Sequence, residues 1–322
     1  MRIERITAVI PCYNASKYIN QCLWSVRTQT RCVDEIFVVD DCSTDESKRI
    51  IAGHPAVRLL TTQKNSGHAT ARNLGIREAS GEVIAWLDAD DFWEANHVET
   101  VVGLLEKHPD AAVAFSGVRL FPSMTNVWNT FPCEDNVGWI LSYAMERTVV
   151  PAMSAVTRTE AIRAVGGYDE SVRIAPDFDL WLRMSLIYKF VSTARVTSNY
   201  RCHGDQISLT KRQEQIASAI RSRFKVYKAL LDAKQHEKAR DLANVSLKEW
   251  TGQIWNAWET DDRQALRLFL SLSACVPGSE AVFRKYRRRL LIPAAMTPTL
   301  KWVLGLCQMR RSKLPLTATG RR

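Results

Sequence analysis

Two aspartates with metal-binding spacing, Asp88 and Asp90, follow the apolar run at residues 83–87. Side chains two residues apart on an extended chain project to the same side, and Mg²⁺ and Mn²⁺ prefer oxygen ligands. A cation held there could bridge the phosphates of a nucleotide-sugar and neutralise the charge on the leaving diphosphate. The alternative is an acidic loop that caps the helix expected after Asn96. Because Asp88 and Asp90 directly follow a strand-like run, we favour the metal site over the capping loop.

A second acidic pair, Asp40 and Asp41, ends the apolar run at residues 36–39. A carboxylate at a strand end can accept hydrogen bonds from the base or ribose of a nucleotide. The alternative is that one of them caps the helix expected after Ser43, and both roles can hold, one for each aspartate. Arg72, in the first turns of a helix, could reach a diphosphate or orient an aspartate, although an exposed helical arginine is usually only solvated.

Two later residues could act on a substrate. Asp177 begins an amphipathic helix, and a carboxylate there could take the proton of an attacking hydroxyl, typically worth about 10²–10⁴-fold in rate. A helix N-terminus favours the ionised form, but Asp177 could equally be a cap without chemistry. His203 follows a strand-like segment and is a candidate metal ligand, although a lone histidine is more often structural.

The elements that must position these residues alternate between strand and helix. Apolar runs predict strands at residues 6–10, 36–39, 57–60 and 83–87, and amphipathic stretches predict helices at 16–30, 43–51 and 66–79. Ser43 is expected to cap the second helix. This order predicts a parallel sheet with helices on both faces, where ligands gather at the carboxyl ends of the strands.

The remainder of the chain is less regular. Strand-like segments are expected at residues 127–131, 149–156 and 190–199, a helix from about Asp177, and a helical pattern beyond Ser208. We detect no internal repeat or low-complexity segment. The eight cysteines form no Cys-x-x-Cys pair, which suits reduced thiols rather than a zinc or redox motif.

Composition indicates a folded protein of the cytosol. The chain has 322 residues, of which 46% are hydrophobic. No run approaches the roughly 18 apolar residues of a membrane-spanning helix, and the N-terminal segment does not resemble a signal peptide.

The net charge of +10 is concentrated near the C-terminus. Residues 284–322 hold eleven Lys and Arg and no acidic residue, while the rest of the chain holds 33 basic and 34 acidic residues. Interleaved Leu and Trp residues suit peripheral contact with the anionic inner face of a membrane. A partly disordered solubilising tail is an equal alternative, and no nucleic-acid-binding module accompanies the charge.

Six short motifs occur in an order that resembles the family-two inverting glycosyltransferases with the GT-A fold, over roughly residues 4–205. They are Val9-Ile10-Pro11-Cys12-Tyr13-Asn14, Val38-Val39-Asp40-Asp41-Cys42-Ser43-Thr44-Asp45, Asn65-Ser66-Gly67 with Ala71-Arg72-Asn73, Leu87-Asp88-Ala89-Asp90-Asp91, Gly166-Gly167-Tyr168-Asp169, and Asp177-Phe178-Asp179-Leu180-Trp181-Leu182-Arg183.

The resemblance implies a site and a reaction. Asp90 and His203 would bind Mn²⁺ or Mg²⁺, and Asp177 would be the general base. The residues that bind the nucleotide-sugar would be Pro11, Tyr13, Asn14, Asp41, Arg72, Asp88 and Ala89. The base would deprotonate an acceptor hydroxyl, which displaces the nucleoside diphosphate with inversion. Pro176 departs from the family, in which this position is often acidic.

The implied organisation is a GT-A catalytic domain at residues 1–205 and a helical extension at 206–322. The expected acceptor is a sugar or a lipid-linked sugar, in synthesis of cell-surface polysaccharide or glycolipid. A dinucleotide-dependent oxidoreductase is disfavoured because the first strand does not lead into Gly-x-Gly-x-x-Gly. A protein that binds nucleotide-sugars without catalysis stays open as an alternative.

Overall fold

The computed structural model describes residues 2–123, 126–128, 136–141, 150–204, 206, 210–260 and 262–272. The chain divides into two compact units, Met1–Val226 and Tyr227–Arg322. The first unit includes residues beyond 205, where the predicted catalytic domain ends, because Ser218 Oγ donates to the Ile174 carbonyl at 2.6 Å and Lys225 pairs with Asp169. The assignment of domains by function stays a prediction, and the basic segment 284–322 lies outside the described residues.

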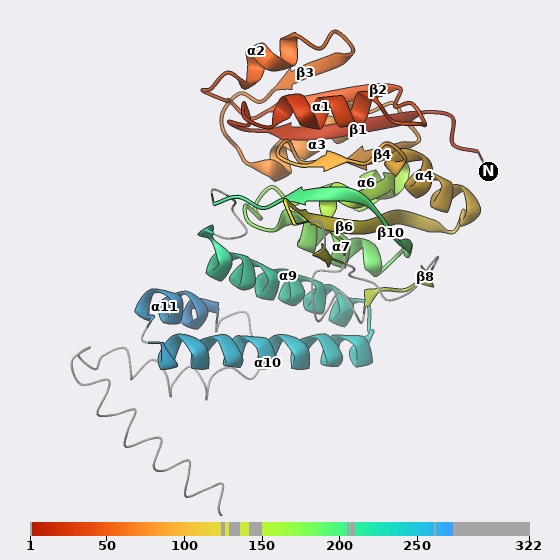
Figure 1. Cartoon of the computed structure of the whole chain (residues 1–322). Helices are drawn as coiled ribbons and strands as arrows, with labels where there is room; N and C mark the ends of the chain where they lie inside the picture. The colour runs from red at the N-terminus through yellow and green to blue at the C-terminus, as the bar shows by residue number, and fades with distance from the viewer. Residues whose placement is uncertain are drawn as a thin grey trace, which may run out of the picture. The chain divides into compact units, whose positions relative to one another are not determined.

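A mixed sheet forms the core of the first unit (Figure 1). Its strands follow the order β3-β2-β1-β4-β9-β6-β10-β5, with β7 beside β6 and β8 beside β10. Their bounds are β1 Ile6–Cys12, β2 Glu35–Asp40, β3 Val57–Thr61, β4 Val83–Trp86, β5 Phe92–Trp93, β6 Ala111–Phe121, β7 Val127–Trp128, β8 Asn136–Gly138, β9 Ala155–Arg158 and β10 Lys189–Arg201.

Strand direction brings the candidate residues to one edge of the sheet. The pairs β1/β2, β2/β3, β1/β4 and β6/β10 are parallel. Strand β9 runs antiparallel to both β4 and β6, so β4 and β6 point the same way. The carboxyl ends of β1, β2, β4 and β10 therefore share an edge, and each leads into a loop that carries candidate site residues.

Helices cover both faces of this sheet. The first unit contains α1 Ile19–Arg27, α2 Ser47–Ala52, α3 His68–Glu78, α4 His97–Lys107, α6 Thr159–Ala164, α7 Pro176–Ser185 and most of α9 Arg212–Asp232. One buried cluster joins Ile10 and Val38 of the sheet with Leu23 of α1, Ile51 of α2 and Val101 of α4. On the opposite face, α3 packs directly on β1.

Three local predictions need correction. Ser43 does not cap α2, which begins at Ser47 after Glu46 without a side-chain cap; the Ser43 hydroxyl instead accepts a hydrogen bond from the Asn14 backbone. Residues 150–154 precede β9 as a loop and a 3-10 turn, so the strand expected there is shorter. Of the strand expected at 127–131, the structure describes only Val127–Trp128.

The second unit contains α10 His236–Glu259 and α11 Arg263–Ser271. Asp262 caps α11 by accepting from the Ala265 backbone at 2.8 Å, and the buried Trp250 indole donates to the Phe269 carbonyl at 2.6 Å. Helices α9, α10 and α11 confirm the helical pattern predicted beyond Ser208 for the residues described up to 272. Throughout the described ranges, no helix has both the length and the apolar composition required to cross a bilayer.

Candidate functional site

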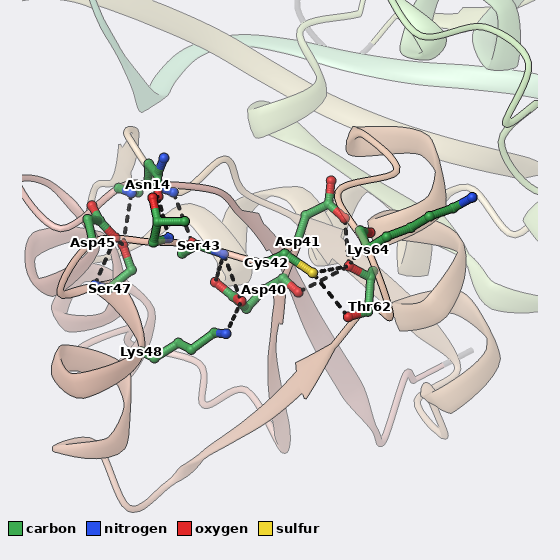
Figure 2. A network of polar contacts seen from close by, with 12 residues as sticks. Asn14, Asp40, Asp41, Cys42, Ser43, Asp45, Ser47, Lys48, Thr62 and Lys64 are labelled. Atoms are coloured by element: carbon green, nitrogen blue, oxygen red, sulfur yellow. Dashed lines mark hydrogen bonds and ion pairs between the residues drawn. The ribbon is translucent and has the colours of Figure 1, made fainter.

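The loops after β1 and β2 are fastened together (Figure 2). Asn14 adopts φ 50°, its backbone N–H donates to Ser43 Oγ at 2.9 Å, and its Oδ1 accepts from the Thr44 backbone at 2.8 Å. Asp40 accepts from the Ser43 backbone at 3.1 and 3.3 Å and pairs with Lys48 at 3.3 Å. Asn14 and Asp40 therefore shape the loops, and Asp40 caps the turn rather than a helix.

Asp41 connects the β2 loop to the start of α3. Its buried carboxylate accepts from the Gly67 backbone at 2.6 Å, the Ser66 backbone at 3.0 Å and Thr62 Oγ1 at 2.6 Å. A negative charge is favourable at this end of a helix. The Ser66 N–H also lies 3.1 Å from the second Asp41 oxygen, so these contacts use roughly the four acceptor positions that a carboxylate offers.

Arg72 and Asp88 form a partly buried ion pair between α3 and the loop after β4. Arg72 is 5% exposed, and its guanidinium carbon lies 5.4 Å from the Tyr168 ring centroid. Burial lowers the pKa of Arg72, but Asp88, Tyr168 and Asp177 outweigh this effect and raise it, so the guanidinium stays charged. The buried Tyr168 hydroxyl and Arg72 Nε have no hydrogen-bond partner.

Asp90 and His203 come together from segments 113 residues apart in the sequence. His203 Nε2 lies 3.0 Å from Asp90 Oδ2, and the two side chains are 19% and 34% exposed. The Tyr18 ring lies against His203, with centroids 5.0 Å apart. The structure thus brings both predicted metal ligands into direct contact at an accessible position.

Asp177 occupies the first turn of α7, which begins at Pro176 after Ala175 in the left-handed conformation. Burial raises the pKa of Asp177, Arg72 lowers it and Asp88 raises it, and the net shift is upward. Its carboxylate therefore lies within electrostatic range of the Arg72–Asp88 pair. It is ionised, as a base must be, only above this raised pKa.

The remaining predicted residues lie in β1 or on the loops that follow β1 and β4. Pro11 is buried in β1 opposite Val39, and Ala89 is buried between the two aspartates of the β4 loop. Tyr13 is 49% exposed, with its ring free to cover a ligand. Sequence reasoning gave no role to Arg201, although its guanidinium contacts the Asp90 backbone.

Comparison of sequences gives matches over most of the chain. Residues 7–148 match the family model described as glycosyl transferase family 2. A chondroitin synthase from Escherichia coli is 29% identical over 267 residues, covering 81% of this chain and 37% of that protein. A hyaluronan synthase from Pasteurella multocida is 28% identical over 218 residues, covering 65% of this chain and 22% of that protein. The chain thus spans well under half of these relatives.

Solved structures share the fold. S. aureus TarS 1-349 in complex with UDP-GlcNAc superposes with a TM-score of 0.69 at 16% identity, covering 94% of this chain and 88% of that one. The mannosyltransferase PcManGT from Pyrobaculum calidifontis, in complex with GDP-Man and Mn²⁺, gives 0.57 at 19% identity, covering 97% and 83%. In sequence the chain resembles the glycosyltransferases of family 2, whose model matches residues 7–148, and it has their GT-A fold.

Proposed function

We propose that this chain transfers a sugar from a nucleotide-diphosphate-sugar to an acceptor hydroxyl, with a divalent cation and with inversion at the anomeric carbon. The contact between Asp90 and His203, next to the Arg72–Asp88 pair, carries the proposal. The names of the relatives, chondroitin and hyaluronan synthases, support a role in polysaccharide synthesis. The proposed acceptor is therefore a sugar or a lipid-linked sugar.

The proposed donor site follows the edge of the sheet from β2 to β10. The nucleoside would lie against Tyr13, beside Pro11, Asn14 and Asp41. The diphosphate and ribose would lie near Arg72, Asp88 and Ala89. UDP, UDP-GlcNAc and GDP-Man in structural neighbours support a nucleoside diphosphate as the shared part of the donor.

The residues present fit Mn²⁺ or Mg²⁺. Asp90 Oδ2 and His203 Nε2, which lie 3.0 Å apart, would hold the cation, since a carboxylate oxygen and an imidazole nitrogen are both metal ligands. Among the described residues, no group of three or more His, Cys, Asp or Glu could hold a metal. Two protein ligands leave positions for phosphate and water oxygens, as is usual for Mg²⁺ in nucleotide sites.

The catalytic roles follow from charge and placement. A cation bound there would neutralise negative charge on the leaving diphosphate. Asp177 would accept the proton of the acceptor hydroxyl as the oxygen attacks the anomeric carbon. Arg72 holds Asp88 in place and, through its charge, opposes the rise in the Asp177 pKa that burial causes.

The test is donor consumption and product formation with UDP- and GDP-sugars, a panel of sugar acceptors and Mn²⁺. Asp177→Asn keeps the shape of the side chain and removes the base, so we expect transfer to fall by about 10²–10⁴-fold. Asp110→Asn is the matched control, since Asp110 pairs with Lys189 at 2.8 Å at the opposite edge of the sheet.

Two results would count against the proposal. Transfer at the wild-type rate by folded Asp177→Asn would remove the base from its role. Binding of nucleotide-sugars without turnover of any donor would favour the alternative, a binding protein without catalysis.

A further inference from the structure

Arg201, the last residue of β10, lies among three aromatic rings. Its guanidinium carbon is 5.0 Å from the ring centroid of Tyr18, 5.4 Å from that of Phe92 and 5.1 Å from that of Phe121. The rings of Phe92 and Phe121 meet edge to face, with centroids 5.3 Å apart. A cation within about 6 Å of an aromatic centroid is attracted to the ring, so three separate segments hold this guanidinium.

The same guanidinium is hydrogen-bonded to the loop after β4, which carries the candidate ligand Asp90. Arg201 Nε donates to the Asp90 carbonyl at 2.8 Å, and its NH2 group donates to Gln21 Oε1 of α1 at 2.6 Å. The Arg201 backbone N–H donates to Asp91 Oδ1 at 2.8 Å. Arg201 therefore holds the carbonyl of Asp90 and the side chain of the residue that follows it.

The second candidate ligand is tied to Arg201 as well. The Arg201 carbonyl accepts from Gln206 Nε2 at 2.5 Å, and Gln206 Oε1 accepts from the His203 backbone at 3.0 Å. Tyr18 contacts the Arg201 guanidinium on one side and the His203 ring on the other. Both candidate ligands are thus positioned through one arginine.

We propose that Arg201 is a positioning residue that holds Asp90 and His203 at the separation a divalent cation requires. This inference rests on the proposed function. Lysine cannot substitute, because its single ammonium lacks the planar fork that bonds Asp90 and Gln21 while facing three rings. In this role Arg201 acts through Asp90 and His203.

The test measures the Kd of the full chain for Mn²⁺ by electron paramagnetic resonance, with excess UDP or GDP present and no acceptor. Substitution of a residue that orients metal ligands typically weakens metal binding about 10–100-fold. We therefore expect Arg201→Lys to raise the Kd for Mn²⁺ by at least about tenfold. Arg58→Lys is the matched control, because Arg58 lies 5.4 Å from the Phe37 ring centroid and pairs with Glu78 at 2.8 Å, on β3.

The variants separate this inference from the proposed function. If Asp90→Ala and His203→Ala lose Mn²⁺ but folded Arg201→Lys binds it like wild type, the positioning role is wrong and the metal site stands. If Asp90→Ala and His203→Ala both bind Mn²⁺ normally, the metal site itself fails. Gln21→Leu releases one hydrogen bond of the guanidinium and is expected to raise the Kd severalfold. Should Arg201→Lys not fold, an unchanged Kd in Gln21→Leu would contradict the inference.

Discussion

Arg72 sets the charge balance among the residues of the site. It is buried between Asp88 and the Tyr168 ring, and its charge lowers the pKa of Asp177 against the effect of burial. Without that guanidinium, Asp88 and Asp177 would repel each other in a poorly solvated place, and the proton would stay on Asp177 to higher pH. The same arginine therefore serves the proposed base and the proposed diphosphate site.

His97, at the start of α4, is expected to make the stability of the fold depend on pH. It is fully buried, stacks on Trp93 with centroids 4.4 Å apart, and has Nδ1 2.8 Å from Thr197 Oγ1. Burial lowers the pKa of His97 from 6.5 to about 3. Since the unfolded chain takes up this proton first, stability present above pH 6.5 is lost as pH falls towards 3.

We predict that His97 lowers the free energy of unfolding by about 1.4 kcal/mol for each unit that the pH decreases between 6.5 and 4.5. His97→Gln cannot titrate and should remove that slope in denaturant unfolding. His236→Gln, at an exposed position, should keep it. An unchanged slope in His97→Gln would mean that the buried ring is not held neutral.

At the scale of elements, the fit of α3 against β1 places Arg72. Gly75 lies on the face of α3 towards the sheet, and a Cβ added there would lie 2.4 Å from Val9 Cγ1. Val9 is completely buried, so it has little room to move. The absence of a side chain at Gly75 thus lets α3 approach closely enough for Arg72 to reach Asp88.

We predict that Gly75→Ala destabilises the chain by about 1–3 kcal/mol, as overpacking of a core does. Gly103→Ala is the control within α4, because a Cβ there meets no atom within 4 Å; it should stabilise by roughly 0.5–1 kcal/mol. Chemical unfolding of the two variants measures both effects. Equal responses would show that α3 does not depend on the close approach.

The sequence predicts the first half of the sheet well and the second half less well. Strands β1 to β4 are short, mostly apolar runs separated by helices, and this alternation is visible from the sequence alone. The antiparallel insertion of β9 has no such signal, because a buried strand has the same composition in either direction. Its place between β4 and β6 is set by tertiary pairing.

The candidate site residues also divide into those that stand out in the sequence and those whose role depends on tertiary contacts. Asp41, Asp88 and Asp90 stand out as candidates because each follows a strand whose end is visible in the sequence. Asp177 stands out at the start of an amphipathic helix, and His203 after a strand-like segment. Arg201 does not stand out, because its role depends on α1, the β4 loop and β6, which lie far from it along the chain.

At the scale of the whole molecule, the proposed chemistry lies within the first compact unit. Every candidate site residue lies in Met1–Val226, and the second unit contributes helices with their own buried contacts, such as that of Trp250. The charge of the whole chain is also divided, since the basic excess falls in residues 284–322. The net charge of +10 therefore says little about the site.

The central claim is that Asp90 and His203, after the ends of β4 and β10, hold a cation that binds a nucleoside diphosphate. The most direct test is the unfolding temperature of the full chain with UDP or GDP, with and without Mn²⁺, because a ligand that binds the folded state stabilises it by mass action. We predict that the nucleotide raises the unfolding temperature strongly only with Mn²⁺, and that Asp90→Ala abolishes this rise while Asp110→Ala keeps it. Equal stabilisation without the metal, or in Asp90→Ala, would contradict the account.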